Sequence, residues 1–132
     1  MYYKTTESLI AFIKKSPTAF QAMAEMEKKF AENGYQLLSE REHWILQPGG
    51  KYIVTRNRSA LIAFSIPKKD CRKFHIIPSH SDSPAFTIKE NPETRVETAY
   101  TTLKVEGSGG MPMATWFDRP LSLAGRGVVR RD

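Results

Sequence analysis

A histidine and an aspartate stand two residues apart in the segment IIPSHSDSP at residues 76–84. In extended backbone, side chains two residues apart point to the same side of the chain. An imidazole binds zinc through one ring nitrogen, and a carboxylate beside the other nitrogen fixes its tautomer and orientation. We therefore interpret His80 as a zinc ligand and Asp82 as the catalytic-site carboxylate that orients it. The alternative, which the triplet alone favours, is a polar turn after a buried strand.

Two apolar segments precede this pair and predict strands. Residues 60–66 (ALIAFSI) are apolar almost throughout, which is typical of a strand covered on both faces. Residues 73–77 predict a further strand, which would place His80 at its carboxyl end, where open α/β sheets bind ligands. The other histidines are weaker candidates: we expect His75 in the core or at a sheet edge and His43 in solvent.

The N-terminal part of the chain predicts two helices. Apolar residues between Thr6 and Lys15 share one face, and Ser16-Pro17 ends that helix. The second helix begins at Thr18, whose hydroxyl is expected to accept the backbone N–H of Gln21, and it ends at Asn33-Gly34. Its buried face is expected to contain Phe20, Met23, Ala24, Met26 and Phe30.

Short strands and a domain boundary are expected after the helices. Strands are predicted at residues 35–38, 44–46 and 51–55, the last two joined by a hairpin turn at residues 48–50. Polar and apolar residues alternate over residues 96–106, which is typical of an antiparallel strand with one face in solvent. Helices and buried strands are predicted before Asn91-Pro92, so a domain boundary is expected there. The class is therefore α/β, with residues 1–91 forming part of one domain and residues 92–132 beginning a β-rich one. Because residues 127–132 begin a predicted strand, truncation is expected.

The composition and net charge of the chain exclude several classes of function. The 132 residues are 40% hydrophobic and 26% charged, which suits one modest core and does not indicate disorder. The chain lacks both a long apolar run and the apolar core of a signal peptide, which predicts a cytoplasmic protein with no membrane partner. One cysteine, Cys71, excludes an internal disulfide. The net charge of +6 would suit a nucleic-acid module, but Lys and Arg are spread along the chain, so no nucleic-acid partner is expected.

Residues 116–119 combine two large aromatic side chains with a charge pair. Trp, Phe and Arg commonly anchor interfaces, which favours a partner-contact surface formed by Trp116, Phe117, Asp118 and Arg119. The alternative is a tight corner in which Asp118 and Arg119 satisfy each other or backbone groups.

Taken in order, these stretches resemble the aspartyl aminopeptidases, the M18 family of zinc metallopeptidases. SPTAF at residues 16–20 resembles the family's Ser-Pro-Thr-Pro-Phe-His stretch, and HSDSP at residues 80–84 is similar to its His-Thr-Asp-Ser-Pro motif. GGKY, TRN and SALIAF between residues 49 and 64 resemble its Gly-Gly-Lys-Tyr, Thr-Arg-Asn and Ser-Leu-Ile-Ala-Phe text. Gly-Gly at residues 109–110 and TWFDRPLSLAGR at residues 115–126 resemble its Gly-Gly and Trp-Phe-Asp-Arg-x-Leu-Ser-Leu-Ala-Gly-Arg block.

The resemblance implies a peptidase that removes N-terminal Asp or Glu from peptides with two zinc ions per active site. It implies an α/β/α catalytic domain interrupted by a β-rich dimerisation domain, with His80 on one zinc and Asp82 steadying that imidazole. The block at residues 116–126 would lie in the inserted domain, where subunits of a homo-oligomer meet. Gln21 replaces the family's usual histidine, Ser81 its threonine and Gly127 a β-branched residue.

The ligand count limits what these residues do alone. A catalytic zinc ordinarily has three protein ligands, and a two-metal site also needs a bridging carboxylate. By the resemblance, the other ligands come after the position where this sequence ends, so at most one partial zinc site is expected here. We therefore expect the 132 residues to be inactive alone. The alternative function is a non-catalytic dimerisation or interaction module derived from the same family.

Overall fold

The computed structural model describes residues 2–70, 72–96 and 99–131. Its elements are α1 (Tyr2–Lys15), α2 (Ala19–Glu32), β1 (Gln36–Leu38), β2 (Lys51–Arg56), β3 (Ala60–Ser65), β4 (Ala85–Val96), β5 (Tyr100–Ser108) and the short 3-10 helix η1 (Met113–Trp116). One compact unit contains residues 1–82 and 124–132, and the other contains residues 83–123. The predicted α/β class is confirmed. Cys71 lies outside the described residues.

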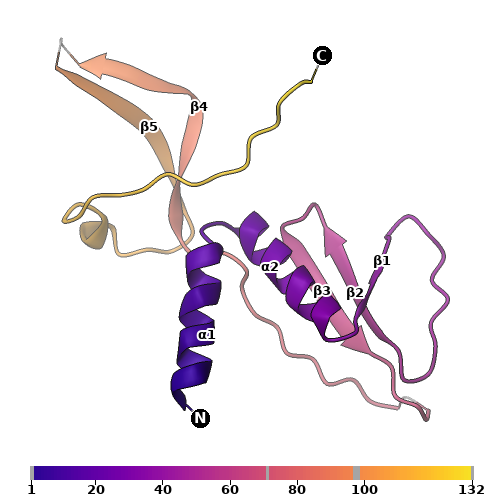
Figure 1. Cartoon of the computed structure of the whole chain (residues 1–132). Coiled ribbons are helices and arrows are strands. Elements are labelled where there is room, and N and C mark those ends of the chain that lie inside the picture. The colour runs from indigo at the N-terminus through magenta and orange to yellow at the C-terminus, as the bar shows by residue number, and fades with distance from the viewer. Residues whose placement is uncertain (1, 71, 97–98, 132) are drawn as a thin grey trace. The chain divides into compact units, whose positions relative to one another are not determined.

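The first unit is built on a three-stranded sheet in the order β1-β2-β3 (Figure 1). β2 is central, pairing in parallel with β1 and antiparallel with β3. The helix α2 packs against β2 and β3. Tyr52, Ile53 and Val54 of β2 are buried, as are Ala22 and Met23 of α2. Because neighbouring side chains of a strand point to opposite faces, the buried residues of β2 lie on both faces of the sheet, and the Tyr52 ring packs near Phe64 (5.5 Å between centroids) while its hydroxyl accepts the Gln47 N–H.

Both predicted helices are present, and α1 begins earlier than expected. The residue before α2, Thr18, has the extended backbone of a cap, but its hydroxyl contacts the Gln21 side-chain oxygen and not the backbone N–H, so that detail of the predicted cap is wrong. Of the expected buried face, Met23 is buried but Ala24 is exposed, because the sheet covers a narrow stripe of the helix. Gly34, with φ of 81°, follows the end of the helix as predicted.

Replacing Gly34 by alanine is expected to lower the free energy of unfolding by about 1 kcal/mol, because an L side chain is strained at positive φ. No atom lies within 4 Å of a Cβ added there, so the cost comes from the backbone alone. Gly125→Ala is the matched control, since Gly125 has equally open surroundings and no positive φ. Urea unfolding of both variants measures the difference, and equal losses would contradict it.

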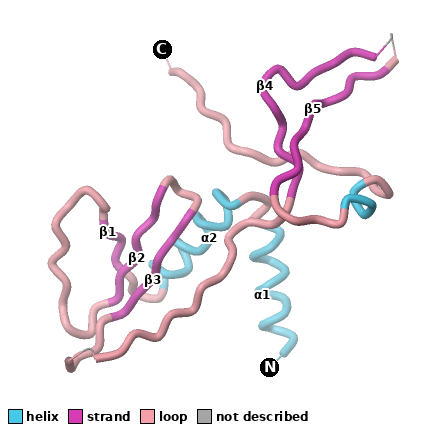
Figure 2. The backbone as a smooth tube through the Cα atoms, turned by 180° about the vertical axis from the view of Figure 1, so that it is seen from behind, coloured by secondary structure: helices cyan, strands magenta, loops and turns pink. Residues whose placement is uncertain are grey.

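Four of the predicted strands are confirmed, those at residues 35–38, 51–55, 60–66 and 96–106, and three are wrong, since residues 44–46, 73–77 and the described residues 127–131 form no strand. Residues 44–46 form no strand: the Trp44 indole N–H donates to the Ser39 carbonyl (2.7 Å) and its ring lies near Phe64 (6.2 Å between centroids). The predicted hairpin at residues 48–50 is therefore replaced by a connection between two parallel strands. Residues 73–77 lie in the loop between β3 and β4, visible in Figure 2, because no described strand pairs with them.

Burial on the sheet is also less complete than predicted. β3 was expected to be covered on both faces, yet Ile62 is 68% exposed because α2 packs on one side of the sheet and no described segment covers this side chain. His75 is exposed, so its expected place in a core or sheet edge is wrong, whereas His43 is exposed as predicted. Among the described residues, no helix has the length and apolar character needed to cross a membrane.

The second unit is an antiparallel hairpin of β4 and β5 followed by η1. The pairing register shifts between Ile88 and Glu93, where Asn91 has φ of 49° and Pro92 follows it. A proline without an N–H and a residue in the left-handed region are typical of a bulge, which explains why this stretch looks like a boundary in the sequence. The compact unit begins at Ser83, inside the predicted first domain. The assignment of the two parts to catalytic and dimerisation domains stays a prediction.

Candidate metal site

His80 and Asp82 lie side by side on the loop that follows β3. The Nδ1 atom of His80 is 3.4 Å from Oδ1 of Asp82, and the two side chains are 94% and 66% exposed. This is the relative placement that the spacing predicts, although the backbone belongs to a loop and not to a strand. Because Nδ1 faces the carboxylate, Nε2 is the nitrogen that the arrangement leaves for a metal.

A hydrogen bond from Ser81 holds this loop beside the turn between β2 and β3. The Ser81 hydroxyl donates to the carbonyl oxygen of Ser59 (3.2 Å), and the Ser59 N–H donates to the carbonyl of Arg56 (3.1 Å). The turn, residues 57–59, has positive φ at Asn57 and Arg58, which is uncommon for residues other than glycine. The pair is thus positioned by a sheet turn far away in sequence, a contact that no local pattern could reveal.

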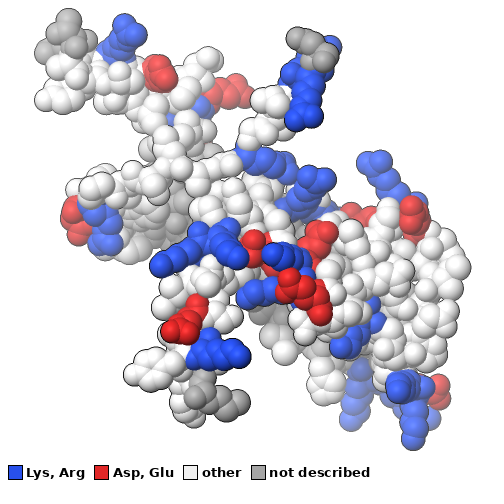
Figure 3. Space-filling model, viewed as in Figure 1, with Lys and Arg blue, Asp and Glu red and all other residues white. Residues whose placement is uncertain are grey.

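An ion pair orders the end of β2 from which this turn begins. Arg56 donates to Oε1 of Glu40 through Nε (2.9 Å) and through its Nη2 atom (2.6 Å). The hydrogen bond to Glu40, together with the attraction between the two charges, raises the pKa of the Arg56 guanidinium above its usual value. On the face of the molecule in Figure 3, lysine and arginine side chains lie at several separate places among neutral and acidic residues.

The side chains near His80 that could act as metal ligands form an incomplete set. Within residues 2–70, 72–96 and 99–131, no group of three or more His, Cys, Asp or Glu side chains is arranged to hold a metal ion. A protein zinc site uses at least three such ligands. His80 and Asp82 therefore fit the parts of one ligand and its orienting carboxylate, and they do not form a complete site among the described residues.

The predicted contact residues of the second unit have different environments. Trp116 is half-buried, with its ring edge-on to Phe86 at 5.1 Å between centroids. Phe117 is exposed, and Nε of Arg119 donates to Oδ1 of Asp118 at 2.9 Å. The last contact agrees with the tight-corner alternative, in which the two charges satisfy each other. The role of the four residues in partner contact stays a prediction.

Comparisons with known proteins match most of this chain to one protein family. The family described as Aminopeptidase I zinc metalloprotease (M18) matches residues 12–132. A protein of Clostridium acetobutylicum named Probable M18 family aminopeptidase 2 is 46% identical over 126 residues, which are 94% of this chain and 29% of the relative. This chain thus spans about 30% of the length of the curated relatives that it matches.

Solved structures show the same likeness in three dimensions. In the structure of the Ape4 and Nbr1 complex, the matched chain has a TM-score of 0.80 and 38% identity, over 85% of this chain and 22% of that chain. The mApe1 dodecamer of S. cerevisiae has a TM-score of 0.76 and 26% identity, over 89% of this chain and 28% of that chain. By family match, sequence identity and fold together, this chain belongs to the M18 family of aminopeptidase I zinc metalloproteases.

Proposed function

We propose that this chain contributes a zinc ligand, His80, and its orienting carboxylate, Asp82, to an M18 aminopeptidase. The observation that carries the proposal is the 3.4 Å approach of Nδ1 to Oδ1 in an exposed pair within the HSDSP motif. An imidazole held in this way presents Nε2 with a defined tautomer. The chemistry that zinc supplies in a peptidase is polarisation of the scissile carbonyl.

The proposed substrates are peptides with an N-terminal Asp or Glu, and the proposed assembly is a homo-oligomer with two zinc ions per active site. The likeness to aspartyl aminopeptidases in the motifs supports the acidic preference, and the dodecameric state of the S. cerevisiae structure supports oligomerisation. A cytoplasmic location and the absence of a nucleic-acid partner stay predictions from sequence.

The substrate preference can be tested in a chimera, defined here as the Clostridium acetobutylicum relative with its matching segment replaced by this chain. Release of the first residue is measured from peptides that differ only in an N-terminal Asp, Glu, Ala or Leu. Faster release of Asp and Glu by both the chimera and its parent would support the proposal. Faster release of Leu or Ala by both would reject the acidic specificity and leave the peptidase assignment standing.

Replacing Asp82 by asparagine in the chimera is expected to lower kcat/KM by about 10- to 100-fold, because the carboxylate that orients a metal-binding histidine is lost. The amide keeps the shape of the side chain but not its charge. Asp70→Asn, in the same loop and likewise exposed, is the control and is expected to keep full activity. Equal activity of the two variants would mean that Asp82 does not act through His80.

Zinc binding by the 132-residue chain alone is expected to be weak, because a complete site needs more ligands than His80 and Asp82 provide. Titration followed by calorimetry should show no saturation at micromolar zinc, and the residual binding should fall further in His80→Ala. Tight stoichiometric binding that persists in His80→Ala would show that the ligand has been assigned to the wrong residue.

The second candidate function is a non-catalytic interaction module, and exposed apolar residues of the hairpin favour it. Ile88, Tyr100, Leu103 and Val105 are all exposed, as is Phe117 after η1. A two-stranded hairpin of this kind is marginally stable by itself and gains from pairing with another surface. Sedimentation of the 132-residue chain and of Phe117→Ser tests it: a dimer that the substitution dissociates supports the module, and a monomer rejects it.

A further inference from the structure

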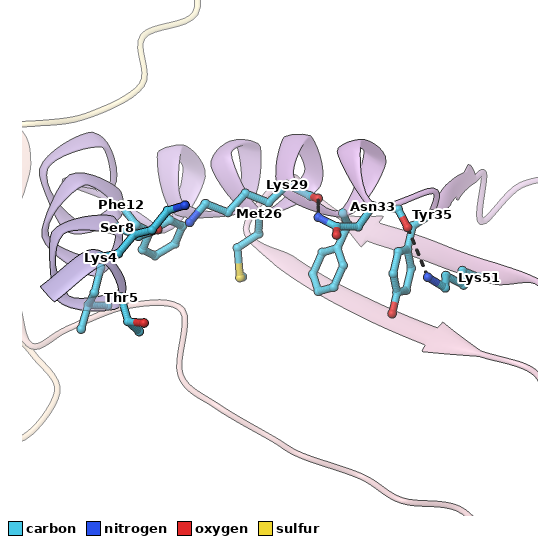
Figure 4. A pocket seen from close by; sticks show the side chains of 11 residues that line it. Lys4, Thr5, Ser8, Phe12, Met26, Lys29, Asn33, Tyr35 and Lys51 are labelled. Atoms are coloured by element: carbon cyan, nitrogen blue, oxygen red, sulfur yellow. Dashed lines mark hydrogen bonds between the residues drawn. The ribbon is translucent and has the colours of Figure 1, made fainter. Parts of the chain in front are cut away.

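A groove of about 1000 Å³ lies between α1, α2 and the beginning of the sheet, away from the His80 loop in sequence (Figure 4). Its floor is apolar: Leu9 and Phe12 come from α1, Met26 and Phe30 from α2, and Tyr35 precedes β1. The volume is at the upper end of the range for small-molecule sites. A floor supplied by two helices is the arrangement that accepts a further amphipathic helix.

Three lysines surround this floor, one from each neighbouring element. Lys4 lies on α1, while Nζ of Lys29 on α2 lies 4.9 Å from the Phe12 ring centroid and Nζ of Lys51 on β2 lies 5.5 Å from the Tyr35 ring. No acidic side chain lines the groove, and in the described part of the chain none of the three lysines forms an ion pair. The rim is therefore positively charged and without a carboxylate partner.

Local contacts hold one end of the groove in shape. The Asn33 side-chain amide donates to the Lys29 carbonyl (2.8 Å), and the Asn33 carbonyl accepts from Lys51 Nζ (3.3 Å), both drawn as dashed lines in Figure 4. The rings of Phe30 and Tyr35 pack with centroids 4.8 Å apart. A groove ordered in this way requires less rearrangement when a partner binds.

We propose that this groove binds an acidic amphipathic helix of a partner polypeptide, with the apolar face of that helix on the floor and its carboxylates at Lys4, Lys29 and Lys51. Charge complementarity carries the choice of occupant. A second copy of this chain has a net charge of +6 and would add positive charge to a rim that already lacks counter-charge. The proposal is independent of the peptidase function.

The test uses the whole 132-residue chain and a labelled synthetic peptide with Leu at helical positions i, i+3, i+4 and i+7 and Glu on the remaining face. Fluorescence anisotropy measures binding at low and moderate salt. A peptide of the same composition, with its leucines spread around the helix, controls for charge alone. The proposal predicts binding of the amphipathic peptide at least about tenfold tighter than that of the control peptide.

Variants of the lysines give the matched comparison. Changing Lys4, Lys29 and Lys51 together to Glu is expected to weaken binding at least about tenfold, and changing them to Gln should cause a smaller loss. The control variant carries the same change of charge at Lys14, Lys69 and Lys104, which do not line the groove. Circular dichroism confirms that each variant keeps its helices. Equal binding by the two Glu variants would overturn the proposal.

Methyl NMR of the methionines locates the bound peptide. Met26 lines the groove, whereas Met111 and Met113 belong to the other compact unit, so the Met26 signal should shift on titration while theirs stay in place. A Met26 shift that follows chain concentration without peptide would overturn the proposal in favour of a second copy. Displacement of the peptide by dodecanoate at lower concentration would overturn it in favour of a small anionic amphiphile.

Discussion

Aminopeptidase activity of the chimera is expected to fall at least about 1000-fold when His80 is replaced by alanine, since the interaction of zinc with the developing charge contributes several kcal/mol. The Asp82 carboxylate, 3.4 Å from Nδ1, would then have no imidazole to orient. The measurement is the rate of release of an N-terminal residue from a peptide at saturating zinc, with kcat and KM determined separately.

His75→Ala is the matched control for this variant. His75 lies on the same loop and is exposed, but no carboxylate of the described residues pairs with its ring. It is expected to keep the activity of the unchanged chimera. If His75→Ala lost as much activity as His80→Ala, the loss would reflect disruption of the loop, and the assigned role of His80 would be contradicted.

The folding of the first unit is expected to depend strongly on Ile53, which is 1% exposed at the centre of the sheet. Replacing it by alanine should lower the free energy of unfolding by about 2 to 5 kcal/mol, because the side chain is lost from a packed interior and a cavity remains. The five buried apolar residues of the chain's described part form a small core, so such a loss should abolish cooperative unfolding.

Ile62→Ala tests whether this effect arises from burial. Ile62 pairs with Val54, the neighbour of Ile53 on β2, but its side chain is 68% exposed. The expected loss is about 1 kcal/mol at most. Thermal and urea unfolding followed by circular dichroism compare the two variants. Similar losses would show that the burial of Ile53 is not the cause of its effect.

The sequence predicts local structure well where the local signals are strong. The two helices, the glycine stop at Gly34 and β3, whose sequence is apolar almost throughout, are all present. The failures are of another kind, because residues 73–77 have strand-like composition but a strand also needs a neighbour to bond with. The strand predicted at residues 44–46 is absent for a related reason, since the Trp44 ring lies near Phe64 without any pairing of its backbone to a strand.

The candidate site shows the same division between local and distant information. The spacing of His80 and Asp82 predicted that they share one side of the chain, because side chains two residues apart point the same way in extended backbone. The bond from Ser81 to Ser59 could not be predicted, since it depends on the path of the loop past the turn between β2 and β3. The lysine-rimmed groove was missed because its three cations come from separate elements.

The most direct test of the central claim is a zinc-edge anomalous difference map from crystals of the chimera. We predict a zinc peak about 2.1 Å from Nε2 of His80, with Nδ1 still facing Asp82. This result would identify His80 as a ligand and Asp82 as the residue that orients it. Zinc bound elsewhere with no peak at His80, or zinc on Nδ1 in place of Nε2, would contradict the assignment.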